Sequence, residues 1–289
     1  VAPSLTGETG LFELTNAETL GSGRFSFGLS YSKWDRVASS SLIVAPGADD
    51  PLRYGTSKLG LTIGFGLTSN VDMGLSVGQR YYFSDTRSWS GVINGHGVAG
   101  AVDHDETDKV RLGVKWLVNP KGPDAVRVVL FGGLTFPTQA KNDPLALSTY
   151  RTDWDFGASL NYGIVTGQFS YLNNADIGTP NSGDTRIGFD LPNELRVGLG
   201  LAVPVIPNVL RGIAEINRIH YDGGETKPPD FSEATLGARF GLGNTGFTAS
   251  GAVRANIDRW VKYGSSPSNI GGLVQLAYMP QPPSGPDRV

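Results

Sequence analysis

Residues 53–83 read RYGTSKLGLTIGFGLTSNVDMGLSVGQRYYF, and this stretch decides the fold class. From 59 to 68, Leu, Ile and Phe alternate with Gly and Thr, and the alternation resumes after Ser69 and Asn70. Two runs with a period of two, joined by a tight turn, predict a β-hairpin. One face of each predicted strand is continuously apolar, and the other is small, polar or charged.

The same pattern returns along most of the chain. Further alternating runs lie at 24–34, 109–118, 126–136, 153–164, 167–174, 193–203, 209–221, 232–242, 246–257 and 269–279. With the two strands of the hairpin, they predict twelve strands. Because Gly, Ser, Thr and Arg occupy the face opposite the apolar one, the pattern favours a barrel that turns apolar residues toward lipid and polar residues toward a lumen. The facing of 126–136 and 209–221 stays open, since apolar residues occur on both parities there.

The predicted connections alternate in length. Those at 69–70, 119–125, 165–167, 204–208 and 243–245 are short, whereas those at 35–53, 84–108, 137–152, 175–192, 222–231 and 258–268 are long. Short turns at one end, long loops at the other and an even strand number are typical of bacterial outer-membrane barrels. The sequence therefore predicts an all-β, transmembrane, antiparallel up-and-down β-barrel in the bacterial outer membrane, with both termini periplasmic.

Three regions follow from this pattern. Residues 1–23 lack clean alternation, so we expect a segment on the periplasmic side or inside the lumen. Residues 24–279 form the transmembrane barrel. The Pro-rich stretch 280–289 is typical of a stiff, extended linker or tail, which suggests a chain that continues.

Composition narrows the function. The 289 residues contain 40 Gly and no Cys, so disulfides, thiolate metal sites and Cys nucleophiles are excluded. No run of 18 apolar residues predicts a transmembrane helix. The net charge is -3 and no Lys/Arg block occurs, so nucleic acid is not an expected partner. The expected partners are the lipid bilayer and lipopolysaccharide, with a cell-wall or protein partner as a further expectation.

Strand parity turns a set of charged side chains toward the predicted lumen. A net-basic lumen of this kind would favour anions. In the opposing interpretation, Arg–carboxylate pairs fill and stiffen a closed lumen. Twelve strands lie between the eight that side chains fill and the sixteen that leave a channel, so the count leaves both interpretations open. The predicted lumen-lining residues are Asp72, Arg80, Arg111, Lys115, Arg127, Asp155, Glu194, Arg196, Arg211, Glu215, Arg239 and Arg254.

Other candidate sites are weaker. The acidic run 103–108 lacks the Gly and terminal Glu of a calcium loop, so a solvated loop is favoured over a metal site. The match to G-x-G-x-x-G at 241–246 precedes a predicted strand instead of the required helix. His96, His104 and His220 have no partner identifiable by spacing, so we expect no enzyme and no cofactor. Aromatic residues near strand ends read as interfacial girdles, namely Tyr31, Trp34, Tyr81, Tyr82, Trp116, Trp154, Tyr221 and Tyr278.

Three stretches carry a resemblance to a known family. Residues 6–32 read TGETGLFELTNAETLGSGRFSFGLSYS, residues 59–77 contain LTIGFGLTSNVDMGLSV, and residues 276–283 read LAYMPQPP. Together they resemble the barrel part of OmpA-family outer-membrane proteins. That resemblance implies a membrane anchor, no catalytic residues, and a Pro-rich linker leading to a peptidoglycan-binding domain. The best-known members have eight strands and this chain is predicted to have twelve, and the 289 residues do not include such a domain.

Two functions follow as expectations. The first is a narrow porin-like passive channel for small solutes, with the connections 84–108 and 137–152 as candidate constrictions. The second is a closed structural barrel that anchors or scaffolds a partner, as the OmpA resemblance implies. A third interpretation, an outer-membrane hydrolase, would need a His beside a Ser or Asp at the rim.

Overall fold

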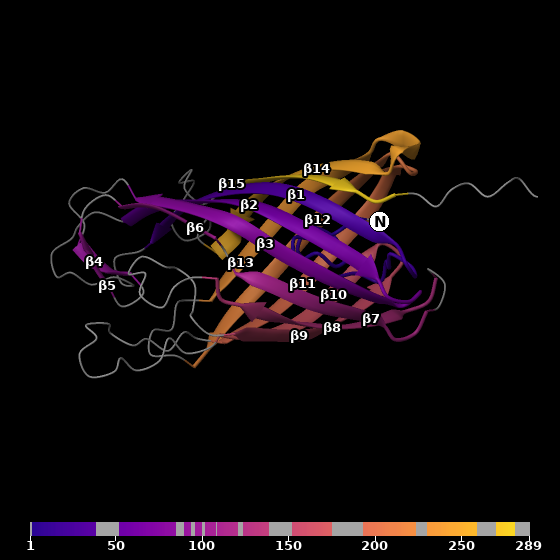
Figure 1. The fold of residues 1–289 in the computed structure, drawn as a ribbon, viewed down its shortest axis with the longest axis horizontal. Coiled ribbons are helices and arrows are strands. Elements are labelled where there is room, and N and C mark those ends of the chain that lie inside the picture. The colour runs from indigo at the N-terminus through magenta and orange to yellow at the C-terminus, as the bar shows by residue number, and fades with distance from the viewer. Residues whose placement is uncertain are drawn as a thin grey trace, which may run out of the picture.

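The computed structural model describes residues 2–38, 52–84, 90–93, 96–99, 102–107, 109–120, 124–138, 152–174, 193–223, 230–258 and 270–280. Almost all of the described chain after residue 24 is β-strand (Figure 1). The strands are β1 (Phe25–Ala38), β2 (Leu52–Gly66), β3 (Val71–Ser84), β4 (Ser90–Ile93), β5 (His96–Ala99), β6 (Val102–Thr107), β7 (Val110–Leu117), β8 (Arg127–Phe136), β9 (Asp153–Tyr162), β10 (Val165–Asn173), β11 (Asn193–Ile206), β12 (Leu210–Asp222), β13 (Phe231–Gly241), β14 (Phe247–Asn256) and β15 (Ile270–Tyr278).

The sheet closes on itself. Neighbouring strands pair antiparallel in chain order, and β1 pairs with both β2 and β15. Thirteen strands belong to this sheet, but β6 and β7 lie end to end along β3 and together supply one wall position. The result is the predicted closed barrel of twelve strands. Closure matters because it leaves no unpaired strand edge to face lipid.

Several predicted boundaries were wrong. The stretch 84–108 is not simply a loop, because β4 and β5 form a hairpin and β6 continues the pairing with β3. Likewise, β2 begins at Leu52, inside the predicted loop 35–53, and β10 begins at Val165 and not at 167. At the long-connection end the strand residues no longer alternate apolar and polar, yet their backbone groups still pair. A search based on apolar periodicity cannot detect such extensions.

The outer surface of the barrel is apolar. Large hydrophobic side chains point outward from every wall strand, and Leu199 and Leu236 are 50% and 69% exposed. Among the predicted girdle residues, Tyr31, Tyr81 and Trp116 are exposed; the side chains of Trp34 and Tyr82 lie outside the described ones. An apolar surface that surrounds a whole barrel far exceeds the patches that water-exposed monomers carry, so the surface is suited to lipid.

No helix in the described ranges is long and apolar enough to cross a membrane.

The interior is polar at the wall, and an N-terminal segment fills its centre. Residues 2–20, here called the plug segment, fold back among the strands before β1 begins (Figure 1). Two backbone bridges, Pro3 with Thr9 and Gly10 with Thr15, shape it into tight bends. Six of its apolar side chains are at most 3% exposed, and Leu5 is half-buried. The six are Ala2, Leu11, Phe12, Leu14, Ala17 and Leu20.

Candidate functional site

Glycines on the inner wall leave room for the plug segment. A Cβ built on Gly74 would lie 2.6 Å from the backbone nitrogen of Glu8, and one on Gly200 would lie 2.6 Å from Cδ1 of Leu11. A Cβ on Gly66 would overlap the carbonyl oxygen of Gly21, where the chain leaves the lumen. Real Cβ atoms essentially never come this close to other atoms, so the wall sequence fits the segment at these points.

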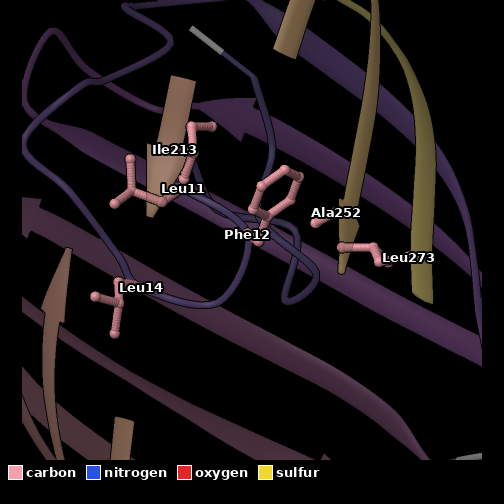
Figure 2. Close-up of a cluster of buried hydrophobic side chains, with 6 residues drawn as sticks. All are labelled: Leu11, Phe12, Leu14, Ile213, Ala252 and Leu273. Carbon is pink, nitrogen blue, oxygen red and sulfur yellow. The ribbon is translucent and has the colours of Figure 1, made fainter. Parts of the chain in front are cut away.

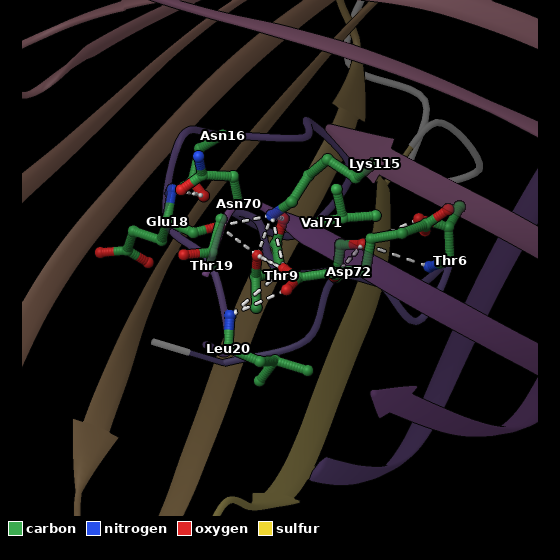
Figure 3. A network of polar contacts seen from close by, with 12 residues as sticks. Thr6, Thr9, Asn16, Glu18, Thr19, Leu20, Asn70, Val71, Asp72 and Lys115 are labelled. Atoms are coloured by element: carbon green, nitrogen blue, oxygen red, sulfur yellow. Dashed lines mark hydrogen bonds and ion pairs between the residues drawn. The ribbon is translucent and has the colours of Figure 1, made fainter. Parts of the chain in front are cut away.

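One contact cluster joins the plug segment to β3 and β7 through a buried ion pair (Figure 3). Lys115 Nζ lies 3.2 Å from Asp72 Oδ2, and both side chains are 0% exposed. Lys115 also donates to the carbonyl oxygens of Thr9 and Glu18 and to the Thr9 hydroxyl. Asp72 accepts from Thr9 Oγ1 at 3.0 Å and from the N–H of Leu20 at 3.0 and 3.2 Å. The pair therefore satisfies backbone groups of the plug segment at Thr9, Glu18 and Leu20.

A second cluster holds the bend at residues 10–14 by its backbone. Three consecutive N–H groups, of Phe12, Glu13 and Leu14, donate to Glu215 Oε1 at 3.0, 3.2 and 3.2 Å. On the other side of the bend, the guanidinium of Arg239 donates to the carbonyl oxygens of Gly10 (3.0 Å) and Leu11 (3.1 Å). Charge-assisted hydrogen bonds of this kind are stronger than neutral ones.

Apolar contacts support the same bend. Leu11, Phe12 and Leu14 form one buried cluster with side chains of β12, β14 and β15 (Figure 2). Those wall residues are Ile213, Ala252 and Leu273. Ile213 is 1% exposed, which resolves the open facing of 209–221. The odd positions point inward, and Ile213 among them packs on the plug segment.

Carboxylates of the plug segment meet arginines of the wall. Arg111 donates to both carboxylate oxygens of Asp155 at 2.8 Å and to Glu8 Oε1 at 2.7 Å. Arg254 lies between Glu13 and Glu233.

Arg211 pairs with Glu18 at 2.7 Å. Burial favours the neutral form of Glu18, whereas the charge and hydrogen bond of Arg211 act in the other direction and lower its pKa.

Seven of the twelve predicted lumen-lining residues thus contact the plug segment directly, and Asp155 does so through Arg111. The seven are Asp72, Arg111, Lys115, Arg211, Glu215, Arg239 and Arg254. For the other four, no described hydrogen bond or ion pair reaches the segment, although Arg196 is close enough to Glu13 to interact with its charge. Glu194 and Arg196 pair with each other at 2.8 Å, Arg127 is half-buried on β8, and Arg80 is half-buried on β3.

Sequence reasoning did not identify the partners that the plug segment supplies. Glu8, Glu13 and Glu18 recur every five residues in 1–23, a stretch that contains no Lys or Arg. An acidic segment beside a predicted net-basic lumen was the available signal. Glu233 was also missed, although it shares the inward parity of Arg239.

The outcomes for the weaker sites differ. In the described ranges, no group of three or more His, Asp or Glu could hold a metal ion. The imidazole of His220 lies 2.6 Å from the carboxylate of Asp230, so the His–Asp contact that the hydrolase interpretation required is present, but no described hydrogen bond joins His220 to a hydroxyl. The side chains of His96 and His104 lie outside the described ones. A short turn and then strand β14 follow Gly241, as expected. Most of the loop 137–152 and of the Pro-rich tail lies outside the described residues.

Comparison with known proteins gives the fold and not a family. No family model and no curated protein matches the chain, so the OmpA resemblance stays a prediction. An outer-membrane channel from Pseudomonas putida F1, a crystal structure, is similar over 93% of this chain and 100% of its own, with 10% identity and a TM-score of 0.62.

Two other solved structures are less similar. The CymD monoaromatic hydrocarbon channel matches over 97% of both chains with 11% identity and a TM-score of 0.45. The translocator domain of the autotransporter NalP from Neisseria meningitidis covers 89% of this chain and 88% of its own, with 11% identity and a TM-score of 0.45.

The shared twelve-strand fold and the apolar exterior place this barrel in the bacterial outer membrane.

Proposed function

We propose that the protein is a passive outer-membrane channel for small solutes, and that the plug segment closes its lumen from within. The observation that carries this proposal is the polar inner wall, whose charged groups complete their hydrogen bonds on a segment and not only on one another. A barrel built to stay closed could fill its lumen with wall side chains alone, as eight-stranded barrels do. Twelve strands leave a space that a separate piece of chain fills here.

The tether of the plug segment gives the direction of release. The segment joins β1 through Gly21 and Gly23, which have φ values of +82° and +72°, and Gly66 fixes this junction through backbone hydrogen bonds to Gly23 and Arg24. This junction lies at the short-turn end of the barrel. Short turns face the periplasm in barrels of this class, so the segment would leave toward the periplasm while β1 stays in the wall.

The charge balance favours anions once the segment leaves. Among the twelve predicted lumen-lining residues, eight are basic and four are acidic, and the plug segment adds three carboxylates. Removing those carboxylates leaves the lumen more positive, and rings of basic side chains favour anion passage.

The test is conductance of full-length chains in planar bilayers. A Leu11→Glu/Leu14→Glu chain places two charges in the buried cluster without changing any barrel residue, and each unpaired charge there costs several kcal/mol. A Leu11→Met/Leu14→Met chain is the matched control, since Leu-to-Met swaps preserve volume. We expect steady open-channel conductance steps from the Leu11→Glu/Leu14→Glu variant. We expect long periods without conductance from the Met control and from the native chain.

The plug segment's many contacts also favour a second function, a permanently closed barrel that anchors or scaffolds a partner, as the OmpA resemblance implies. The same measurement separates the two. Suppose that the Leu11→Glu/Leu14→Glu variant is folded and inserted and that its plug segment is displaced. If it then shows no conductance, the channel function is refuted and the anchor function is supported.

A further inference from the structure

We propose that the lumen wall formed by β11–β15 is a binding site for short apolar peptides that adopt a tight turn, and that the bend at residues 10–14 occupies it as a built-in ligand. The site is accessible only when the plug segment leaves, so the inference rests on the proposed function. Its ligand class is read from the groups that the wall presents to the bend.

The wall recognises peptide backbone. Glu215 accepts three consecutive N–H groups, and Arg239 donates to two consecutive carbonyl oxygens. Consecutive N–H groups that converge on one anion are a feature of tight turns. The bend closes on itself through the N–H of Leu11 and the carbonyl of Leu14 at 2.9 Å, so the recognised shape is a turn and not an extended strand.

The wall also selects apolar side chains. Ile213, Ala252 and Leu273 interrupt the polar inner face of their strands where the bend docks. The Arg239 guanidinium carbon lies 5.7 Å from the centre of the Phe12 ring, within cation–π range. Gly198 and Gly200 leave the space that Leu14 and Leu11 occupy. A purely structural lumen would not need backbone acceptors, backbone donors and an apolar floor around a single bend.

The ligand class follows from these three features. A matching solute carries at least three successive amide N–H groups and two or three apolar side chains. The wall groups described around the bend make no contact with a terminal amine or carboxylate, so capped or internal peptide segments fit as well as free peptides. Anionic sugars and aromatic hydrocarbons lack the amide groups that Glu215 accepts.

The experiment uses full-length protein in detergent and a dye-labelled, end-capped hexapeptide with the sequence of residues 10–15. Binding is followed by fluorescence anisotropy on the Leu11→Glu/Leu14→Glu chain. We call a variant whose plug segment leaves the lumen a released chain. A second released chain, Gly66→Ala, displaces the tether through a clash with Gly21 and leaves the proposed site intact. It keeps the test valid should the first variant fold poorly.

Two matched controls test the recognition itself. The same hexapeptide with an N-methyl group at the Phe amide keeps every side chain but loses one N–H donor to Glu215. An Arg239→Gln substitution in the released chain removes the charged donor to the two carbonyls. We expect saturable binding to the released chains, at least about tenfold weaker with either change, because each removes charge-assisted hydrogen bonds.

The outcomes separate this inference from the proposed function. Released chains that conduct but show no saturable binding, or bind the N-methylated peptide equally well, overturn the peptide site and leave the channel standing. Released chains that bind the peptide and do not conduct support the site and overturn the channel.

Discussion

Replacing Lys115 by Met tests how the lumen is held together. Lys115 and Asp72 are buried and 3.2 Å apart, and no other cation contacts Asp72 in the described structure. Met preserves most of the side-chain length and removes the charge and its donors. The Asp72 carboxylate then remains buried without its counter-ion, and the carbonyl oxygens of Thr9 and Glu18 lose a donor.

The expected cost is about 3–5 kcal/mol, the usual result of removing one partner of a buried pair. Asp72→Leu alone should cost about the same. The double variant should cost only about 1–3 kcal/mol, because no charge is left unpaired. The main losses are then the acceptor of the Leu20 N–H and the Lys115 donor to the carbonyl oxygens of Thr9 and Glu18. Two independent losses would instead add to roughly 6–10 kcal/mol.

The free energy of unfolding can be measured by urea titration in lipid vesicles, followed by tryptophan fluorescence. Arg218→Met is the matched control, because Arg218 lies 3.1 Å from Asp258 but is 52% exposed. Exposed pairs contribute about 0–1 kcal/mol. A Lys115→Met cost as small as that of the control, or a double variant whose cost equals the sum of the single ones, would refute the reasoning.

Three further predictions address the wall, the tether and the lumen charge. Leu199→Arg, in the middle of the outer face of β11, should cost about 2–4 kcal/mol in the same unfolding assay, and Val205→Arg near the strand end only about 0–1 kcal/mol; equal costs would contradict a lipid-facing surface. A cysteine engineered at Ala17 would be the only thiol of the chain, so its maleimide labelling rate reports exposure of the plug segment. Gly66→Ala should raise this rate at least about tenfold, because the new Cβ clashes with Gly21. Gly167→Ala, which has open space around it, should leave the rate unchanged. Under a salt gradient, the reversal potential of the Leu11→Glu/Leu14→Glu chain should show anion preference, and cation preference would show that the wall bases do not set selectivity.

The barrel wall was predictable from sequence because lipid imposes a strict rule. Every outward residue must be apolar, so residues 59–68 and 193–203 carry a period of two that identifies strand, face and turn. The start of β2 and the strand β6 were not predicted, because these residues lack a continuous apolar face.

The inward residues were predictable as positions but not as contacts. Parity turned Glu215 and Arg239 toward the lumen, yet it could not show that both bind the backbone of one bend. Backbone N–H and carbonyl groups leave no trace in a side-chain pattern. Phe12 and Glu215 are also separated by 203 positions in the sequence, so no local signal connects them.

The sequence by itself determined the closed all-β barrel, its apolar exterior and the charged character of its interior, because each follows from alternation along single strands. Only the tertiary structure decided what the interior charges do. An aperiodic, acidic N-terminal segment gains its order from the surrounding wall, where Asp72, Lys115, Glu215 and Arg239 bind its backbone. Such long-range contacts arise when the strands bring these residues together, and no shorter piece of the chain encodes them.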